Sequence, residues 1–157
     1  MVYYAGPMFS EAELAFNVKA AAELEKAGLV VRPTQARRKV KDKAGLTVFL
    51  PQRDGGRMSE MLKTMTPDEV SREIFRTDME NIRRAEAFLF VLDGRVPDEG
   101  ACVALGLAYA AGVPCYGLKT DPRTVMDGRM NPMIEGPILR VFASAQEAAA
   151  FLAARSA

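Results

Sequence analysis

The chemistry open to this sequence rests mainly on its carboxylates. Its 157 residues include no histidine, which excludes a Ser-His-Asp triad, a Cys-His pair and a His-ligated metal site. Acid–base or nucleophilic chemistry therefore falls to Asp, Glu, Lys, Tyr or Cys. The two cysteines, Cys102 and Cys115, lie among small residues of a predicted helix and strand, and we interpret both as core residues.

One carboxylate falls on the apolar side of a predicted helix. Within residues 67–84, Ile74, Asp78 and Ile82 recur four residues apart, with Phe75 beside them. A carboxylate that faces a core is costly unless it is paired, hydrogen-bonded or lines a cavity. The alternative is a boundary position where the apolar stripe drifts around the helix. We favour Asp78 as a carboxylate that lines a pocket.

Glycine-rich or polar segments follow three predicted strands, at residues 6–9, 52–55 and 93–100. In a doubly wound sheet, ligands bind beyond the carboxyl ends of the strands. The last segment, DGRVPDEG, opens onto a helix N-terminus, which favours an oxyanion or a carboxylate. Asp98 in this segment is either a ligand-binding group or simply the cap of the following helix, and the segment alone leaves both open.

Short apolar runs alternate with helical patterns along the chain, which is typical of a parallel sheet with crossover helices. Ser10 with Glu13 forms a predicted capping box, Gly28 fits the end of that helix, and Thr66 precedes Pro67 at a second helix start. We predict a doubly wound α/β domain of about five parallel strands flanked by helices. The predicted strands are 2–5, 47–50, 87–92, 113–118 and 138–142, and the helices 10–27, 67–84, 101–111 and 145–154.

The composition is that of one ordinary globular domain spanning residues 1–157. Hydrophobic residues make up 49% and charged residues 26%, which excludes disorder and low complexity. A net charge of +1 gives no argument for nucleic acid or an anionic membrane as partner. No apolar run is long enough for a membrane span, and no signal peptide is evident, so we expect a cytoplasmic protein.

A basic stretch at about residues 30–44 does not fit the alternation of strand and helix patterns. Lys-Ala-Gly-Leu occurs at 26–29 and again at 43–46, and RPTQARRKVKDK between them holds six basic residues against one acid. We interpret the stretch as an inserted surface loop or short hairpin. The alternative is an anion-binding arm for a phosphate.

Taken in order, these segments resemble the nucleoside 2-deoxyribosyltransferase family over nearly the whole chain except the basic insertion. Each piece alone is weak, but the ordered set is specific. The pieces are YYAGPMF at 3–9, LPQRDG at 50–55, the helix of Asp78, LDG at 92–94, DEGACVALG at 98–106 and NPM at 131–133.

The resemblance implies a flavodoxin-like fold and exchange of the nucleobase on a 2′-deoxynucleoside, with deoxynucleosides and free nucleobases as partners. In the family a glutamate attacks the anomeric carbon, the base departs, and a deoxyribosyl-enzyme ester awaits the incoming base. This is the logic of a retaining glycosidase with a base in place of water. It requires neither metal nor cofactor.

Carried over by position, the resemblance assigns roles to particular residues. Asp78 would exchange a proton with the base, Asp98 would hold the sugar hydroxyls, and Tyr3 would lie under the nucleophile. Asn131 would reach the 5′-hydroxyl of a neighbouring subunit's substrate, which implies at least a dimer. The remaining implied substrate contacts are Gly6, Met8, Phe9, Gln52 (to the base), Asp93, Gly94, Gly100 and Met133.

The chain departs from the family at one decisive place. The family motif Asp-x-Gly-x-x-x-Glu-x-Gly has Ala104 where its glutamate should stand. Because the surrounding motif is intact, we hypothesise an engineered substitution that removes the nucleophile, with a natural pseudoenzyme as the alternative. An alanine codon in the source gene would contradict the first idea. As written, the chain should bind substrate but barely react.

Two other readings remain open. A hydrolase of nucleoside 5′-monophosphates would need a phosphate pocket, for which Ser10 and the basic insertion are the candidates. A non-catalytic nucleoside-binding domain is the other, and Ala104 is its best evidence. The sequence does not decide base preference, tolerance of ribose, or dimer against hexamer.

Overall fold

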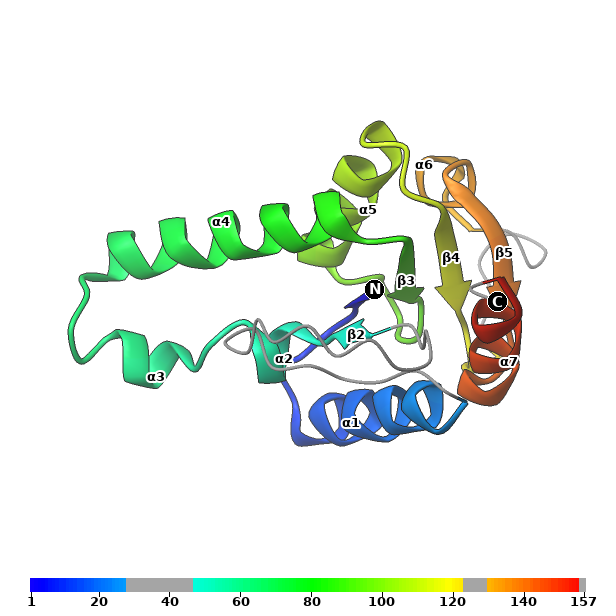
Figure 1. Cartoon of the computed structure of the whole chain (residues 1–157), viewed down its shortest axis with the longest axis horizontal. Coiled ribbons are helices and arrows are strands. Elements are labelled where there is room, and N and C mark those ends of the chain that lie inside the picture. Colours follow the sequence, from blue (N-terminus) through cyan, green and yellow to red (C-terminus); the bar gives the residue numbers. More distant parts are fainter. Residues whose placement is uncertain (28–46, 123–129, 156–157) are drawn as a thin grey trace, which may run out of the picture.

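Five parallel strands form one sheet at the centre of the computed structural model, which describes residues 1–27, 47–122 and 130–155 (Figure 1). Their order is β2-β1-β3-β4-β5, and every neighbouring pair is parallel. This order is flavodoxin-like, and it confirms the doubly wound α/β domain predicted from the sequence and the fold that the resemblance implies. The strands are β1 (Val2–Ala5), β2 (Val48–Phe49), β3 (Ala87–Val91), β4 (Cys115–Leu118) and β5 (Ile138–Phe142).

Helices cover both faces of the sheet. α1 (Glu11–Lys26) and α7 (Ala145–Arg155) lie together on one face, and α4 (Pro67–Arg84) and α5 (Glu99–Ala110) lie together on the other (Figure 1). Two apolar clusters fill the two layers. Tyr4 belongs to the α1/α7 cluster and Tyr3 to the α4/α5 cluster, so these two neighbouring tyrosines point to opposite faces of the sheet.

The predicted helix starts are present. The Ser10 hydroxyl accepts the Glu13 N–H at 3.3 Å, while the Glu13 carboxylate accepts the Ser10 N–H at 2.8 Å. Thr66 and Glu69 form the same reciprocal pair at the start of α4. α5 ends before Gly112, whose φ of 74° lies in the left-handed region that glycine reaches without a steric penalty.

Several element boundaries were predicted wrongly. α5 starts at Glu99 rather than 101, because Asp98 caps it. Pro51 does not merely close a strand. It begins α2 (Pro51–Asp54), as proline does at a first helical position. The short helices α3 (Met58–Met61) and α6 (Pro132–Glu135) were also missed. The basic insertion and Gly28 lie outside the described residues. None of the described helices is long and apolar enough to cross a membrane.

Candidate functional site

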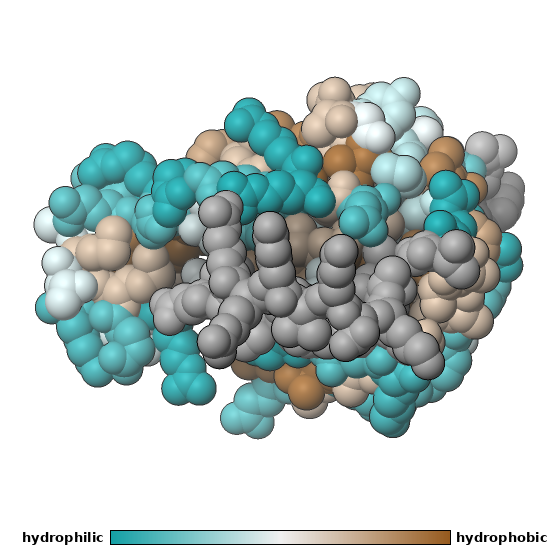
Figure 2. Space-filling view, viewed as in Figure 1, coloured by the Kyte–Doolittle hydropathy of each residue, from teal (hydrophilic) through white to brown (hydrophobic). Residues whose placement is uncertain are grey.

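A cavity of about 440 Å³ opens beyond the carboxyl end of β1, between α4 and α5. Its walls come from β1, the loop after β1, one residue of α2, the inner side of α4, and α5 from its start to Leu107. In Figure 2 the outer side of α4 is hydrophilic, and less hydrophilic side chains lie between α4 and α3. The apolar lining includes Met8, Phe9, Ile74, Phe75, Met79, Ile82, Val103 and Leu107.

The strand order explains why the cavity lies here. β1 and β3 are neighbours, but the chain leaves them toward opposite sides of the sheet, so their loops diverge and leave a crevice. The β1 loop must then pass very close to β3. A Cβ at Gly6 would stand 2.9 Å from the Cβ of Val91, which only a glycine avoids.

Asp78 and Tyr3 face each other in the cavity. The Tyr3 ring is stacked between Phe49, 5.4 Å away, and Phe88, 5.5 Å away, so its hydroxyl is held in one place. Burial raises the pKa of Tyr3, and the Asp78 charge and their hydrogen bond raise it further. The hydroxyl therefore stays protonated and donates to Asp78.

The pKa of the Asp78 carboxyl is raised, mainly by burial, and the hydrogen bond from Tyr3 opposes that rise. A half-buried carboxyl with a raised pKa can hold or release a proton closer to neutral pH than an ordinary one. Asp78 lines the cavity, which confirms the predicted pocket position over a boundary position. The arrangement suits proton exchange with a bound group.

The first half of α5 forms the facing wall. The Asp98 carboxylate accepts the Ala101 N–H at 2.7 Å, so the capping role left open in the sequence is confirmed. Asp98 also lines the cavity, together with Glu99, Gly100 and Ala104. Position 104 thus shares one cavity with Asp78 and Tyr3, and its methyl group offers no chemistry of its own.

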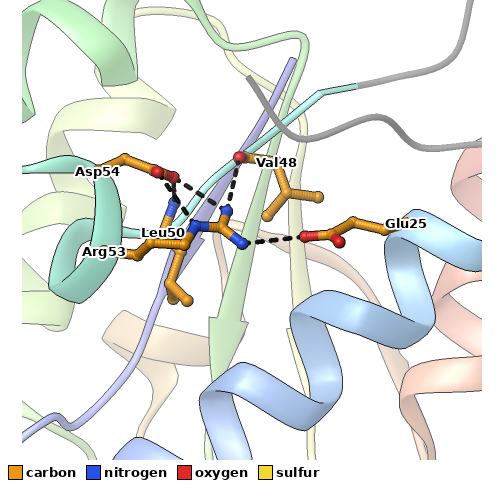
Figure 3. Close-up of polar contacts among 5 residues, drawn as sticks. All are labelled: Glu25, Val48, Leu50, Arg53 and Asp54. Carbon is orange, nitrogen blue, oxygen red and sulfur yellow. Dashed lines mark hydrogen bonds and ion pairs between the residues drawn. The ribbon is translucent and has the colours of Figure 1, made fainter. Parts of the chain in front are cut away.

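Arg53 fixes α2 against α1 and β2 (Figure 3). Its guanidinium donates to Glu25 of α1 at 3.0 Å, to the Val48 carbonyl at 3.3 Å and to Asp54 at 3.0 Å. Asp54 in turn accepts the Leu50 N–H at 2.9 Å. These contacts place the first residue of α2, Pro51, in the cavity wall.

Other predicted site residues lie outside the cavity lining of their own chain. Gln52 is turned toward α1, where it bonds Asn17 and the Leu14 carbonyl. Asp93 instead accepts two backbone N–H groups of the segment after β4, and the Gly94 N–H donates to Asp121 in that segment. Asn131 caps α6, and Met133 is 83% exposed there. Their substrate contacts stay predictions.

The cavity also contains residues that sequence reasoning missed. Ser71 and Met79 of α4 look like ordinary helix positions, and Val103 and Leu107 like core positions of α5. Glu99 stood in the segment at 93–100 that drew attention, but its neighbour Asp98 was preferred. Among the described residues, no group of three or more potential ligand side chains could hold a metal ion.

A sequence model of the nucleoside 2-deoxyribosyltransferase family matches residues 2–137, most of the chain. The chain belongs to the nucleoside 2-deoxyribosyltransferase family. This is a family of pentosyltransferase-type enzymes, and the resemblance drawn from the ordered motifs is confirmed. A comparison with curated proteins found no match.

Solved structures share the fold across nearly the whole chain. A conserved protein from Enterococcus faecalis V583 is 24% identical, with a TM-score of 0.75 and coverage of 98% of this chain and 97% of that one. The 2-deoxyribosyltransferase of Bacillus psychrosaccharolyticus is 21% identical, with a TM-score of 0.64 and coverage of 94% and 89%. A CMP N-glycosidase from Clostridium botulinum is 13% identical, with a TM-score of 0.51 and coverage of 96% and 95%. At these identities the likeness shows the fold alone.

Proposed function

We propose that the cavity binds a 2′-deoxynucleoside in the manner of a deoxyribosyltransferase, with the anomeric carbon facing position 104. One observation carries this: Ala104, at the nucleophile position of the family motif, lines the same cavity as Asp78 and Tyr3. The apolar walls suit the faces of a base and a sugar, and Asp78 can give a proton to a departing base.

With a glutamate at 104, the reaction would proceed in two displacements. The carboxylate would bond to the anomeric carbon as the bond to the base breaks, and Asp78 would protonate the base. An incoming base would then displace the glutamate and return the proton to Asp78. With alanine at 104 no bond can form there, so we propose that the chain as it stands binds nucleosides without exchanging their bases.

Binding can be tested on the chain itself by calorimetric titration with thymidine and deoxyinosine. Ala104→Leu should weaken binding at least tenfold, because the larger side chain fills the cavity where the sugar would lie. Ala150→Leu is the matched control, on the exposed side of α7 away from the cavity. Equal affinities of both variants would contradict the proposal, and tighter binding of 5′-monophosphates would favour the hydrolase.

We also propose that the protein is a homodimer or larger homo-oligomer. α5 carries one charged residue, Glu99. Its exposed side presents Tyr109 and Val103, each 61% exposed, with open space around Gly106 between them, and Val103 also lines the cavity. A helix that is apolar on all sides is normally covered on all sides. A second copy fits, because the small Gly106 in one stripe can receive the large Tyr109 of another. Asn131, outside its own cavity, would then serve a neighbour.

If α5 forms the contact between copies, a charge placed on its exposed side should abolish the dimer. Gly106→Glu should convert the dimer to a monomer in light scattering, because two carboxylates would be buried against each other. Gln146→Glu adds the same charge on an exposed part of α7 and should leave the dimer intact. A monomeric parent protein would contradict this proposal.

A further inference from the structure

A buried amide lies directly behind the wall of the cavity. Apart from tyrosines and a cysteine, Asn17 of α1 is the one buried polar residue in the part of the chain that the structure describes, with 2% of its surface exposed. It does not line the cavity. A buried amide is costly unless its donors and acceptor are satisfied, so its contacts show what it holds together.

Those contacts join three elements. The Asn17 amide nitrogen donates to the backbone carbonyl of Pro7 at 2.8 Å and to the side-chain amide oxygen of Gln52 at 2.8 Å. Its own oxygen accepts the Tyr4 hydroxyl at 3.3 Å. β1, the loop after β1 and α2 therefore meet on one side chain of α1.

The same loop is held a second time from α1. Glu13, one helical turn before Asn17, accepts the Phe9 N–H at 3.0 Å and the Ser10 N–H at 2.8 Å. The loop is thus held at the Pro7 carbonyl and at the Phe9 and Ser10 N–H groups. Within it, the side chains of Met8 and Phe9 line the cavity while 39% and 81% of their surfaces stay exposed. Few packing contacts restrain such exposed side chains, so the backbone bonds must set where this wall stands.

We call the bonds of Asn17 to Pro7 and Gln52 the tether. Both polar groups of the Gln52 side chain are hydrogen-bonded on this side of the wall. Its amide oxygen accepts from Asn17, and its amide nitrogen donates to the Leu14 carbonyl at 3.1 Å. A side chain that reads a nucleobase must point its amide into the cavity, and Gln52 is not among the residues that line it. Here both polar groups of Gln52 lie on the α1 side of the wall.

We propose that Asn17 and Gln52 are positioning residues that fix the 7–9 wall of the cavity from behind, and that Gln52 does not read the base. The wall would then stand in its binding form before a nucleoside arrives, and the affinity gained would be independent of which base is bound. The affinity part of this proposal rests on the proposed function, whereas the tether itself does not.

The tether can be separated from a purely structural role with two substitutions. Asn17→Asp keeps the acceptor for Tyr4 but replaces the two donated hydrogen bonds with a carboxylate facing two oxygens. Gln52→Met keeps the length of the side chain and removes both polar ends. Asn81→Asp is the control, because within the described part of the chain the Asn81 amide bonds only the Thr77 carbonyl of its own helix, and Asn81 does not line the cavity.

We expect each substitution to raise the Kd about tenfold, by the same factor for thymidine and deoxyinosine, and to speed hydrogen exchange at the Phe9 and Ser10 amides, which Glu13 holds. The double variant should lose less binding free energy than the two single losses added together, because both substitutions remove the same hydrogen bond between Asn17 and Gln52. The control should change none of these. Unfolding by urea, measured alongside, ensures that every variant is compared in its folded state.

Three results would overturn the proposal. A Kd change for Gln52→Met that differs between the two nucleosides would mean that Gln52 reads the base. Lower unfolding stability with unchanged Kd and unchanged exchange at Phe9 and Ser10 would leave Asn17 a structural residue only. If the parent binds no nucleoside, the proposed function fails by itself, and unchanged exchange at the two amides in the variants would then overturn the tether.

Discussion

The Ala104→Glu protein should form deoxyadenosine from thymidine and adenine about a thousandfold faster, or more, than the protein as it stands. Removing the nucleophile of a covalent mechanism costs at least this much, so restoring it should return the same factor. The cavity already supplies the other parts, since position 104 shares it with Asp78 and Tyr3. Chromatographic separation of the products measures the rate.

The control for this gain is Ala104→Gln. It has nearly the size of the glutamate and the same place on α5, but its amide cannot form the ester, so it should stay as inactive as the parent. Thymine released without any new nucleoside would make the restored protein a hydrolase. No turnover in any variant, with nucleoside binding retained, would leave a binding domain.

Replacing Asp78 should have the second largest effect. In the Ala104→Glu background, Asp78→Asn should slow base exchange roughly a hundredfold or more, because an amide cannot give a proton to the departing base. The loss should be smallest for a donor nucleoside whose base leaves easily without a proton. An equal loss for good and poor leaving bases would show that Asp78 is not the acid.

The pH dependence follows from the raised pKa of Asp78. The acid works only while protonated, so kcat of the Ala104→Glu protein should fall as pH rises through that raised pKa. Tyr3→Phe removes the hydrogen bond that opposes the rise, so the pKa should climb further and the fall in kcat should move to higher pH. A shift toward lower pH would contradict this assignment of the two side chains.

Elements with a strong periodic or capping signal were predictable from the sequence. The buried strand β3 and the helix starts at Ser10 and Thr66 can be predicted from short stretches of sequence, because each depends on residues within one turn or one strand. The pocket position of Asp78 was predictable for a related reason. A carboxylate on an apolar stripe needs an explanation, and a cavity is a common one.

What the sequence could not predict depends on contacts between distant segments. Asn17 is an unremarkable helix residue until Gln52, 35 positions away, reaches it. Met79 looks like an ordinary position of α4 in the sequence, and only the fold places it in the cavity wall. The family resemblance implies that Gln52 contacts the base, and only the fold shows that its amide bonds Asn17 and the Leu14 carbonyl of α1.

The central claim is that the anomeric carbon of a bound deoxynucleoside faces position 104. It is tested most directly by quenching the Ala104→Glu protein during incubation with thymidine alone and measuring its mass before and after peptide cleavage. The claim predicts a mass gain of one deoxyribosyl group, carried by the peptide of α5 and located on residue 104. An adduct on Asp78, Asp98 or Glu99, or base exchange with no adduct at all, would contradict it.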